Sequence, residues 1–205
     1  MTKPGLLLAS SSPYRKSLLQ KLDLPFECVS PDIDETPQPG ESAKALALRL
    51  AITKARALAQ QHAGKIIIGS DQAAALPDGS LLNKPGSHEQ AMQQLGRSSG
   101  QSVDFLTGLA VLDTRTNTLE CCCETFTAHF RNLSQQEISH YLRKEQPYDC
   151  AGSFKMEGLG ITLFSRLEGR DPNSLVGLPL IALTEILIRL GINPLLQPRA
   201  DGSGL

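Results

Sequence analysis

The stretch Gly5-Leu6-Leu7-Leu8-Ala9-Ser10-Ser11-Ser12-Pro13-Tyr14-Arg15 determines the expected fold, because it reads as a strand, a turn and a helix start. The apolar residues 6–9 predict a short buried strand. Pro13 favours the first position of a helix, where a backbone N–H is not needed. We therefore expect a mixed α/β protein with a twisted sheet flanked by helices.

The serines 10 to 12 of this stretch are candidates for binding a phosphate group. Backbone N–H groups and hydroxyls before a helix can hold an anion, assisted by the helix dipole. The alternative is simple capping of the helix by Ser12. The turn is not a Walker loop, because it has no glycine-rich run ending in Gly-Lys-Ser or Gly-Lys-Thr.

The rest of the chain alternates between strand and helix patterns. Residues 30–41, rich in proline, are expected as a loop, and turns are expected at Asp78-Gly79 and Thr116-Asn117. We expect a single domain over residues 1–196 and a disordered tail over residues 197–205. The pattern predicts strands at 26–29, 65–70, 102–113, 119–130 and 160–167, and helices at 13–22, 42–62, 87–96, 134–144 and 179–190.

Composition and charge indicate an ordinary globular protein. Apolar residues make up 40% of the 205 residues, charged residues 20%, and the net charge is -1. We therefore expect no nucleic acid and no membrane as partner. Five cysteines fit the cytoplasm and are expected as small buried apolar residues. The consecutive residues 121–123 alternate faces in a strand and cannot form one zinc site.

Two cations lie off the polar faces of their predicted helices. In the helix after residue 42, Arg49, Thr53 and Arg56 share the solvent face, whereas Lys54 falls among apolar positions. Arg15 likewise falls on the apolar side of the first helix. Such side chains can extend to water along an apolar surface. Two of them, one beside the serine turn, favour cations that line a cleft and bind phosphate oxygens.

Candidate acids occur at two places in the chain. Glu35 lies in the proline-rich loop, and Asp71 directly follows a predicted buried strand of isoleucines. Loop carboxylates are usually only solvated, but one or two carboxylates with phosphate oxygens are the ligands that magnesium needs. Lys84, before a proline, is a further candidate phosphate contact.

At these residues the chain resembles the Maf family of nucleoside triphosphate pyrophosphatases, from Leu6 to about Leu195. Each motif is weak by itself, but their order and spacing together are specific. The motifs are Leu-Ala-Ser-Ser-Ser-Pro-Tyr-Arg-Lys, Asp-Ile-Asp-Glu-Thr-Pro, Leu-Ala-Ile-Thr-Lys-Ala, Ile-Gly-Ser-Asp-Gln, Asn-Lys-Pro, Leu-Thr-Gly-Leu-Ala, Cys-Ala-Gly-Ser-Phe-Lys-Met-Glu-Gly and Glu-Gly-Arg-Asp-Pro-Asn-Ser-Leu-Val-Gly-Leu-Pro-Leu.

The resemblance implies a fold like that of the inosine-triphosphate pyrophosphatases, with two lobes around a central cleft. It implies cleavage between the α- and β-phosphates with Mg²⁺ or Mn²⁺ as cofactor. Asp71 matches the proton acceptor of the family. Positions that hold the triphosphate and the metal match Ser10, Arg15, Glu35, Lys54 and Lys84, and we expect Glu35 and Asp71 at the metal.

Three positions separate the subfamilies. Tyr14, Gln72 and Glu157 resemble the branch that hydrolyses 7-methyl-GTP to 7-methyl-GMP and pyrophosphate, which removes a modified nucleotide from the pool. That branch usually has Trp at the first position. A π-face and a carboxylate both favour the positive charge of N7-methylated guanine. The structural alternatives are a half-buried helix aromatic for Tyr14 and an ordinary turn for Glu157.

Two other functions stay open at this point. One is a pyrophosphatase for dTTP and UTP or for non-standard purine triphosphates. The other is a nucleotide-binding regulator of cell division, because the family is also associated with septum formation. An intact Asp71 and three cations favour an enzyme over a sensor. Whether the protein forms a homodimer is also left open.

Overall fold

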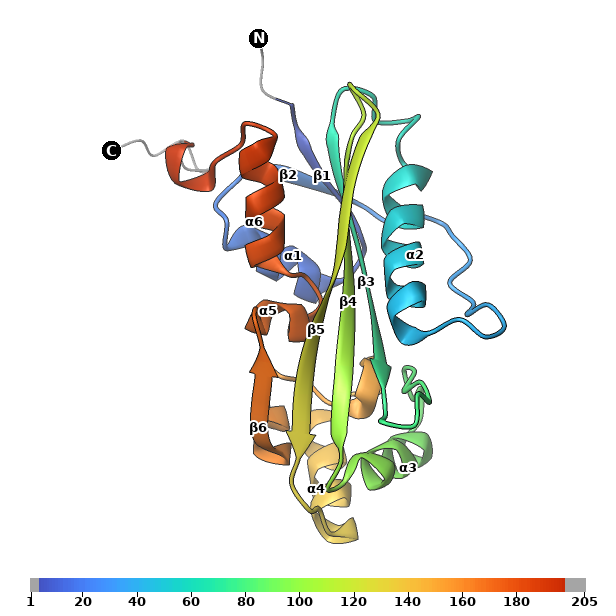
Figure 1. Cartoon of the computed structure of the whole chain (residues 1–205). Helices are drawn as coiled ribbons and strands as arrows, with labels where there is room; N and C mark the ends of the chain where they lie inside the picture. Colours follow the sequence, from blue (N-terminus) through green and yellow to red (C-terminus); the bar gives the residue numbers. More distant parts are fainter. Residues whose placement is uncertain (1–3, 198–205) are drawn as a thin grey trace. The chain divides into compact units, whose positions relative to one another are not determined.

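The structure is a computed structural model that describes residues 4–197 (Figure 1). Its strands form one six-stranded sheet in the order β2-β1-β3-β4-β5-β6. The described residues divide into two compact units, one of residues 4–71, 107–124 and 171–197, the other of residues 72–106 and 125–170. Apart from Gln197, the predicted tail lies outside the described residues, and the prediction of a single domain stays a prediction.

The first unit is built around strand β1 (Leu6–Ala9). This strand lies parallel to both β2 (Phe26–Val29) and β3 (Ile66–Ala75). Its helices are α1 (Pro13–Gln20), α2 (Ala43–Ala57), α5 (Pro172–Val176) and α6 (Leu180–Arg189), and a short 3-10 turn, η3, covers Pro194–Leu196.

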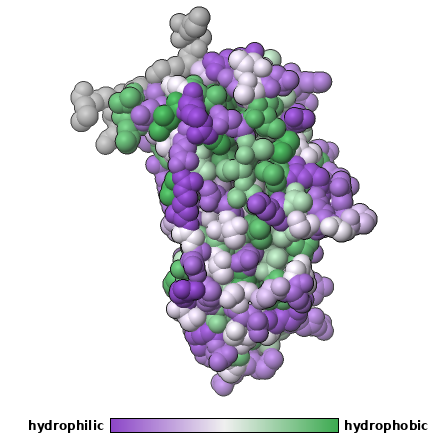
Figure 2. Space-filling view, in the orientation of Figure 1, coloured by the Kyte–Doolittle hydropathy of each residue, from purple (hydrophilic) through white to green (hydrophobic). Residues whose placement is uncertain are grey.

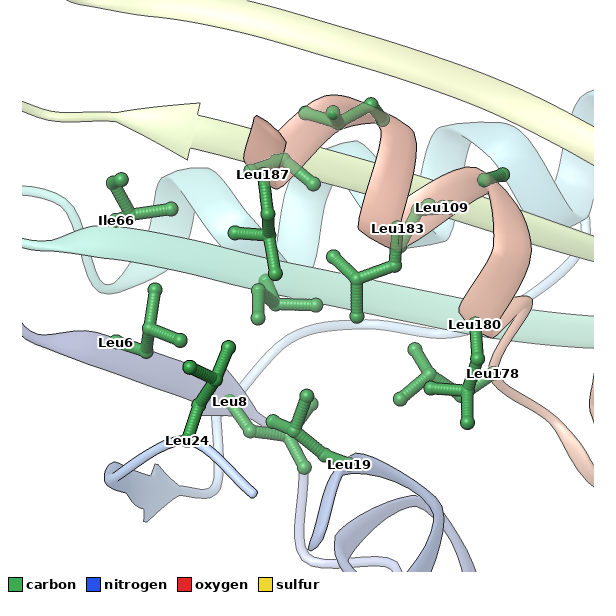
Figure 3. Packing of buried hydrophobic residues seen from close by; sticks show 14 of the residues in the cluster. Leu6, Leu8, Leu19, Leu24, Ile66, Leu109, Leu178, Leu180, Leu183 and Leu187 are labelled. Carbon is green, nitrogen blue, oxygen red and sulfur yellow. The ribbon is translucent and has the colours of Figure 1, made fainter. Parts of the chain in front are cut away.

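Alternate residues of β1 serve two hydrophobic clusters, because successive side chains of a strand point to opposite faces. Leu6 and Leu8 pack with Leu183 and Leu187 of α6 (Figure 3). Leu7 packs on the other face with the alanines of α2. Each fully buried leucine contributes about 1.5–3 kcal/mol, so these two clusters hold the sheet between its helices.

Two glycines allow α2 to lie directly on the sheet. A Cβ atom at Gly69 would lie 2.2 Å from the carbonyl oxygen of Ala51, and one at Gly108 would lie 2.2 Å from that of Ala47. Both distances are far below van der Waals contact. The close approach of α2 therefore requires glycine at these two strand positions.

The second unit contains the other ends of β3, β4 (Ser102–Asp113) and β5 (Thr118–Phe130), with β6 (Phe164–Gly169) antiparallel to β5. Helix α3 (His88–Ser98) and helix α4 (Gln135–Glu145) belong to it, with 3-10 turns η1 (Ala151–Ser153) and η2 (Leu159–Leu163). Ser134 and Glu137 form the capping box predicted for α4. Four phenylalanines pack edge to face in its core: Phe105, Phe130, Phe154 and Phe164.

The mixed sheet with flanking helices confirms the predicted fold class, but three boundaries were wrong. Strand β3 continues to Ala75, so Asp71 lies inside it rather than after its end. Helix α2 ends at Ala57, because the chain must turn back for Ile66 to bond Gly5 beside β1. The strand expected at 160–167 begins only at Phe164, after the 3-10 turn η2.

The cysteines were also predicted wrongly, since Cys28 and Cys121 are exposed and the others are half-buried. Most of the visible surface is polar, with apolar residues gathered in patches (Figure 2). Within residues 4–197 no helix has the length and apolar character needed to cross a membrane. The exposed large apolar side chains are Leu159, Ile161, Ile181, Ile188, Leu195 and Leu196.

Candidate active site

The first unit holds a buried lysine between two carboxylates. The Nζ atom of Lys54 lies 2.6 Å from Oδ1 of Asp71 and 2.7 Å from Oε1 of Glu35. Lys54 is only 6% exposed, as its position off the polar face of α2 predicts. A buried ammonium group needs anionic partners, and these two acids supply them.

Asp71 and Glu35 differ in their exposure to solvent. Asp71 is 8% exposed inside β3, whereas the side chain of Glu35 is 53% exposed in the loop between β2 and α2. Glu35 is therefore the acid that can leave Lys54 at little cost, because water can solvate it. Asp71 is fixed by its strand.

Arg15 belongs to the same charged cluster. Its Nε atom donates to the carbonyl oxygen of Gly177 at 2.9 Å. Burial lowers the pKa of the Arg15 guanidinium, while the carboxylates of Asp71 and Glu35 act in the opposite direction. An arginine kept at a fixed place near two acids can stabilise further negative charge there.

The serine turn is held by its own hydroxyls. Ser12 caps α1 by accepting from the N–H of Arg15, so the capping alternative describes this residue. Ser10 is 7% exposed, and its hydroxyl accepts from the N–H of Ser12 at 3.1 Å. The turn thus has a defined shape, and phosphate binding by Ser10 stays a prediction.

The remaining predicted site residues are less buried. Tyr14 is half-buried on α1 in the first unit. Gln72 is half-buried, and Lys84 and Glu157 are exposed; these three belong to the second unit. The structure therefore brings Arg15, Glu35, Lys54 and Asp71 together in one unit, and the roles of all the predicted site residues stay predictions.

A carboxylate pair on one cation is the part of this cluster that fits a divalent metal. Glu35 and Asp71 already share a positive charge. Magnesium and manganese take such oxygen ligands and complete their shell with water and phosphate oxygens. Among residues 4–197 no group of three or more His, Cys, Asp or Glu side chains could hold a metal. The donor set thus fits a metal that substrate oxygens help to bind.

Sequence reasoning missed two buried polar residues of the first unit. Ser70 is fully buried, and its hydroxyl lies 2.8 Å from the carbonyl oxygen of Gly108 and 3.0 Å from that of Gly177. Asp171, 1% exposed, caps α5 and also accepts from the N–H of Ile181. The Asp171-Pro172 pair is a helix-start signal that could have located α5.

The chain is similar to a protein family and to solved structures. A family model described as "Maf-like protein" matches residues 5–190. The solved structure of a HAM1 protein from Coxiella burnetii is 16% identical and covers 91% of this chain and 100% of its own, with a TM-score of 0.53. At that identity the likeness shows a shared fold. A dITP/XTP pyrophosphatase from Mycobacterium abscessus is 16% identical over 91% of this chain and 97% of its own, with a TM-score of 0.42.

Proposed function

The chain belongs to the Maf-like protein family, and on that premise we propose that it is a nucleoside triphosphate pyrophosphatase. The observation that carries the proposal is the buried Lys54 bridging Asp71 and Glu35, with Arg15 beside them. A buried acid next to two cations supplies both a base and the positive charge that phosphate cleavage requires. A protein that only senses nucleotides has no need of the base.

The positions of these side chains suggest a separate role for each of them in the reaction. Oδ1 of Asp71 is 2.6 Å from Lys54, which leaves Oδ2 to accept a proton from the attacking water. The oxygen of that water forms a bond to the α-phosphorus, and the bond from the α-phosphorus to the bridging oxygen breaks. The products are a nucleoside monophosphate and pyrophosphate. Arg15, Lys54 and Lys84 stabilise the charge on the leaving pyrophosphate, and Ser10 holds a phosphate oxygen.

Glu35 and Asp71 are the residues that would hold Mg²⁺ or Mn²⁺. When bound, the metal neutralises phosphate charge and polarises the α-phosphoryl group. The ammonium group of Lys54 pairs with both carboxylates in this structure and would pair with phosphate oxygens if these acids held the metal. The exposed Glu35 can make that exchange more readily than Asp71 can.

The test is the release of pyrophosphate by an Asp71→Asn variant. We expect turnover to fall by about two to four orders of magnitude, with nucleotide binding largely kept because the cations remain. Asp113→Asn is the matched control: Asp113 is also a buried strand acid, paired with Arg115 outside the cluster. Near-normal turnover in Asp71→Asn would remove Asp71 from the reaction, and nucleotide binding without turnover in the parent would favour the regulator.

Tyr14, Gln72 and Glu157 support 7-methyl-GTP as the substrate, so that the enzyme removes this modified nucleotide from the cytoplasmic pool. A substrate panel of 7-methyl-GTP, GTP, dTTP and UTP tests this directly. The double change Tyr14→Arg with Glu157→Gln introduces a positive charge and removes a negative one, so it should disfavour the cationic base. If the double variant keeps the preference of the parent, these residues do not read the base.

A further inference from the structure

The segment of residues 171–177, between β6 and α6, is built rigidly although it is short. Asp171 accepts from the backbone N–H of Asn173 at 2.8 Å and from that of Ile181 at 2.7 Å. The backbone N–H of Gly177 bonds the carbonyls of Asn173 and Ser174. The segment therefore presents the carbonyl of Gly177 in one direction.

Strands β3 and β4 bind this segment through two buried hydroxyls. Thr107 donates to the carbonyl oxygen of Ser174 at 2.8 Å. The single hydroxyl hydrogen of Ser70 is shared between two carbonyl oxygens, that of Gly177 at 3.0 Å and that of Gly108 in β4 at 2.8 Å. Both Thr107 and Ser70 are fully buried. Buried hydroxyls are costly without partners, so these bonds fix the segment against the sheet.

The Gly177 carbonyl oxygen also accepts from Nε of Arg15, at 2.9 Å. With Nε bonded to Gly177, the four N–H groups on the two terminal nitrogens are left for phosphate oxygens. The carbonyl thus sets the plane of the guanidinium. Ser70 immediately precedes Asp71 in β3, so a single stretch of strand both holds the acid and anchors the carbonyl that orients the arginine.

From these contacts we propose that Ser70 and the Gly177 carbonyl are positioning groups for Arg15 in the pyrophosphatase reaction, an inference that rests on the proposed function. Neither group touches the substrate. They act by fixing the position of the guanidinium relative to Asp71, since a small displacement of a catalytic group lowers the reaction rate by a large factor. Their effect should therefore appear in turnover and should require Arg15.

The backbone of Gly177 has φ +120°, a conformation that residues with a Cβ rarely adopt. A Cβ there would lie 3.5 Å from Nε of Arg15, which is ordinary contact. Gly177→Ala should therefore act by turning the carbonyl, not by a clash with Arg15. Gly177→Ala is therefore a second way to disturb the hydrogen bond between Arg15 and the Gly177 carbonyl.

A double-mutant cycle with Arg15→Lys tests the proposal, because lysine keeps the charge and lacks the Nε donor. We expect Ser70→Ala to lower kcat about tenfold with KM changed less than about twofold. In the Arg15→Lys background the same change should have less than about a twofold effect. Equal losses in the two backgrounds would overturn the proposal, because a purely structural role does not depend on Arg15.

Ser98→Ala is the matched control, since Ser98 is also a fully buried serine whose hydroxyl donates to a backbone carbonyl, that of Gln94. It should leave kcat unchanged in both backgrounds. If Ser70→Ala does not fold, Gly177→Ala and Thr107→Val replace it, with the same dependence on Arg15 expected. Circular dichroism and thermal melting show whether each variant is folded.

The same cycle measured as binding of inorganic pyrophosphate by calorimetry separates this proposal from the proposed function. A parent that binds pyrophosphate but releases none from any nucleoside triphosphate refutes the proposed function. Because pyrophosphate is the leaving group that Arg15 stabilises, Ser70→Ala should weaken its binding in the parent background and not in the Arg15→Lys background; equal losses in both would overturn the positioning role even then. A parent that neither binds pyrophosphate nor turns over a nucleotide overturns both.

Discussion

Replacing Gly69 by alanine should disturb stability and activity together, because Gly69 lies where α2 meets the sheet. The new Cβ would stand 2.2 Å from the carbonyl oxygen of Ala51, 2.9 Å from the nitrogen of Ala55 and 3.1 Å from the Cβ of Ala55. All of these atoms belong to the helix backbone or its first side-chain carbon, so no flexible side chain can yield. Since ordinary contact needs about 3.5 Å, α2 must move outward by roughly 1 Å.

The magnitude follows from this displacement. Overpacking costs typically about 1–3 kcal/mol, and backbone contacts put this case near the upper limit. For a chain of this size each kcal/mol lowers the melting temperature by about 2–4 °C, so we expect a loss of roughly 6–12 °C. Lys54 lies on α2 between the two alanines, and its 2.6 Å bond to Asp71 spans the same interface. A displacement of about 1 Å there should reduce kcat about a hundredfold.

Gly96→Ala is the control, because a Cβ at this position of α3 meets nothing within 4 Å. Alanine in a helix is about 0.5–1 kcal/mol more favourable than glycine, so this variant should melt slightly higher than the parent, with unchanged turnover. The assays are thermal unfolding by circular dichroism and pyrophosphate release at a temperature where both variants are folded. If Gly69→Ala melts within 2 °C of the parent, as an order-of-magnitude margin, the argument from close packing is wrong.

Two further predictions concern the charged residues. Lys54→Met should lower the unfolding free energy by about 3 kcal/mol and abolish measurable turnover, because Asp71 loses its buried partner. Arg166→Met breaks contacts with Glu168 and His129, and because the side chains of Arg166 and Glu168 are 64% and 60% exposed, it should cost about 1 kcal/mol or less. Similar losses in urea denaturation of the two variants would contradict this difference. Backbone and Arg131 hydrogen bonds lower the pKa of Glu137 from 4.5 to about 2, so its stabilisation is complete above pH 4.5 and is lost as the pH falls toward 2. Glu137→Gln should therefore flatten the change in urea midpoint between these pH values, and an unchanged slope would show that Glu137 does not contribute to it.

Local sequence patterns predicted those parts of the molecule that depend on neighbours along the chain. The serine cap at Ser12 and the capping box at Ser134 follow from side chains within three residues of the helix start. Helical periodicity placed Lys54 among apolar positions, and the structure buries it there. Periodicity works for α2 because one side of this helix packs on the sheet and the other meets solvent.

Contacts between distant residues were not predictable in this way. Hydrophobic periodicity takes Gly69-Ser70-Asp71 as the end of a buried strand, because polar side chains inside a sheet are normally costly. The cost is offset here by partners 38 and 107 residues away, the carbonyls of Gly108 and Gly177, and by the Lys54 ammonium. The strand can therefore continue through the polar residues Ser70 and Asp71 to Ala75. The same long-range bonds hold Asp71 and Arg15 near each other. Ser70 and Asp71, which made the strand look shorter in the sequence than it is, are therefore residues on which the proposed chemistry depends.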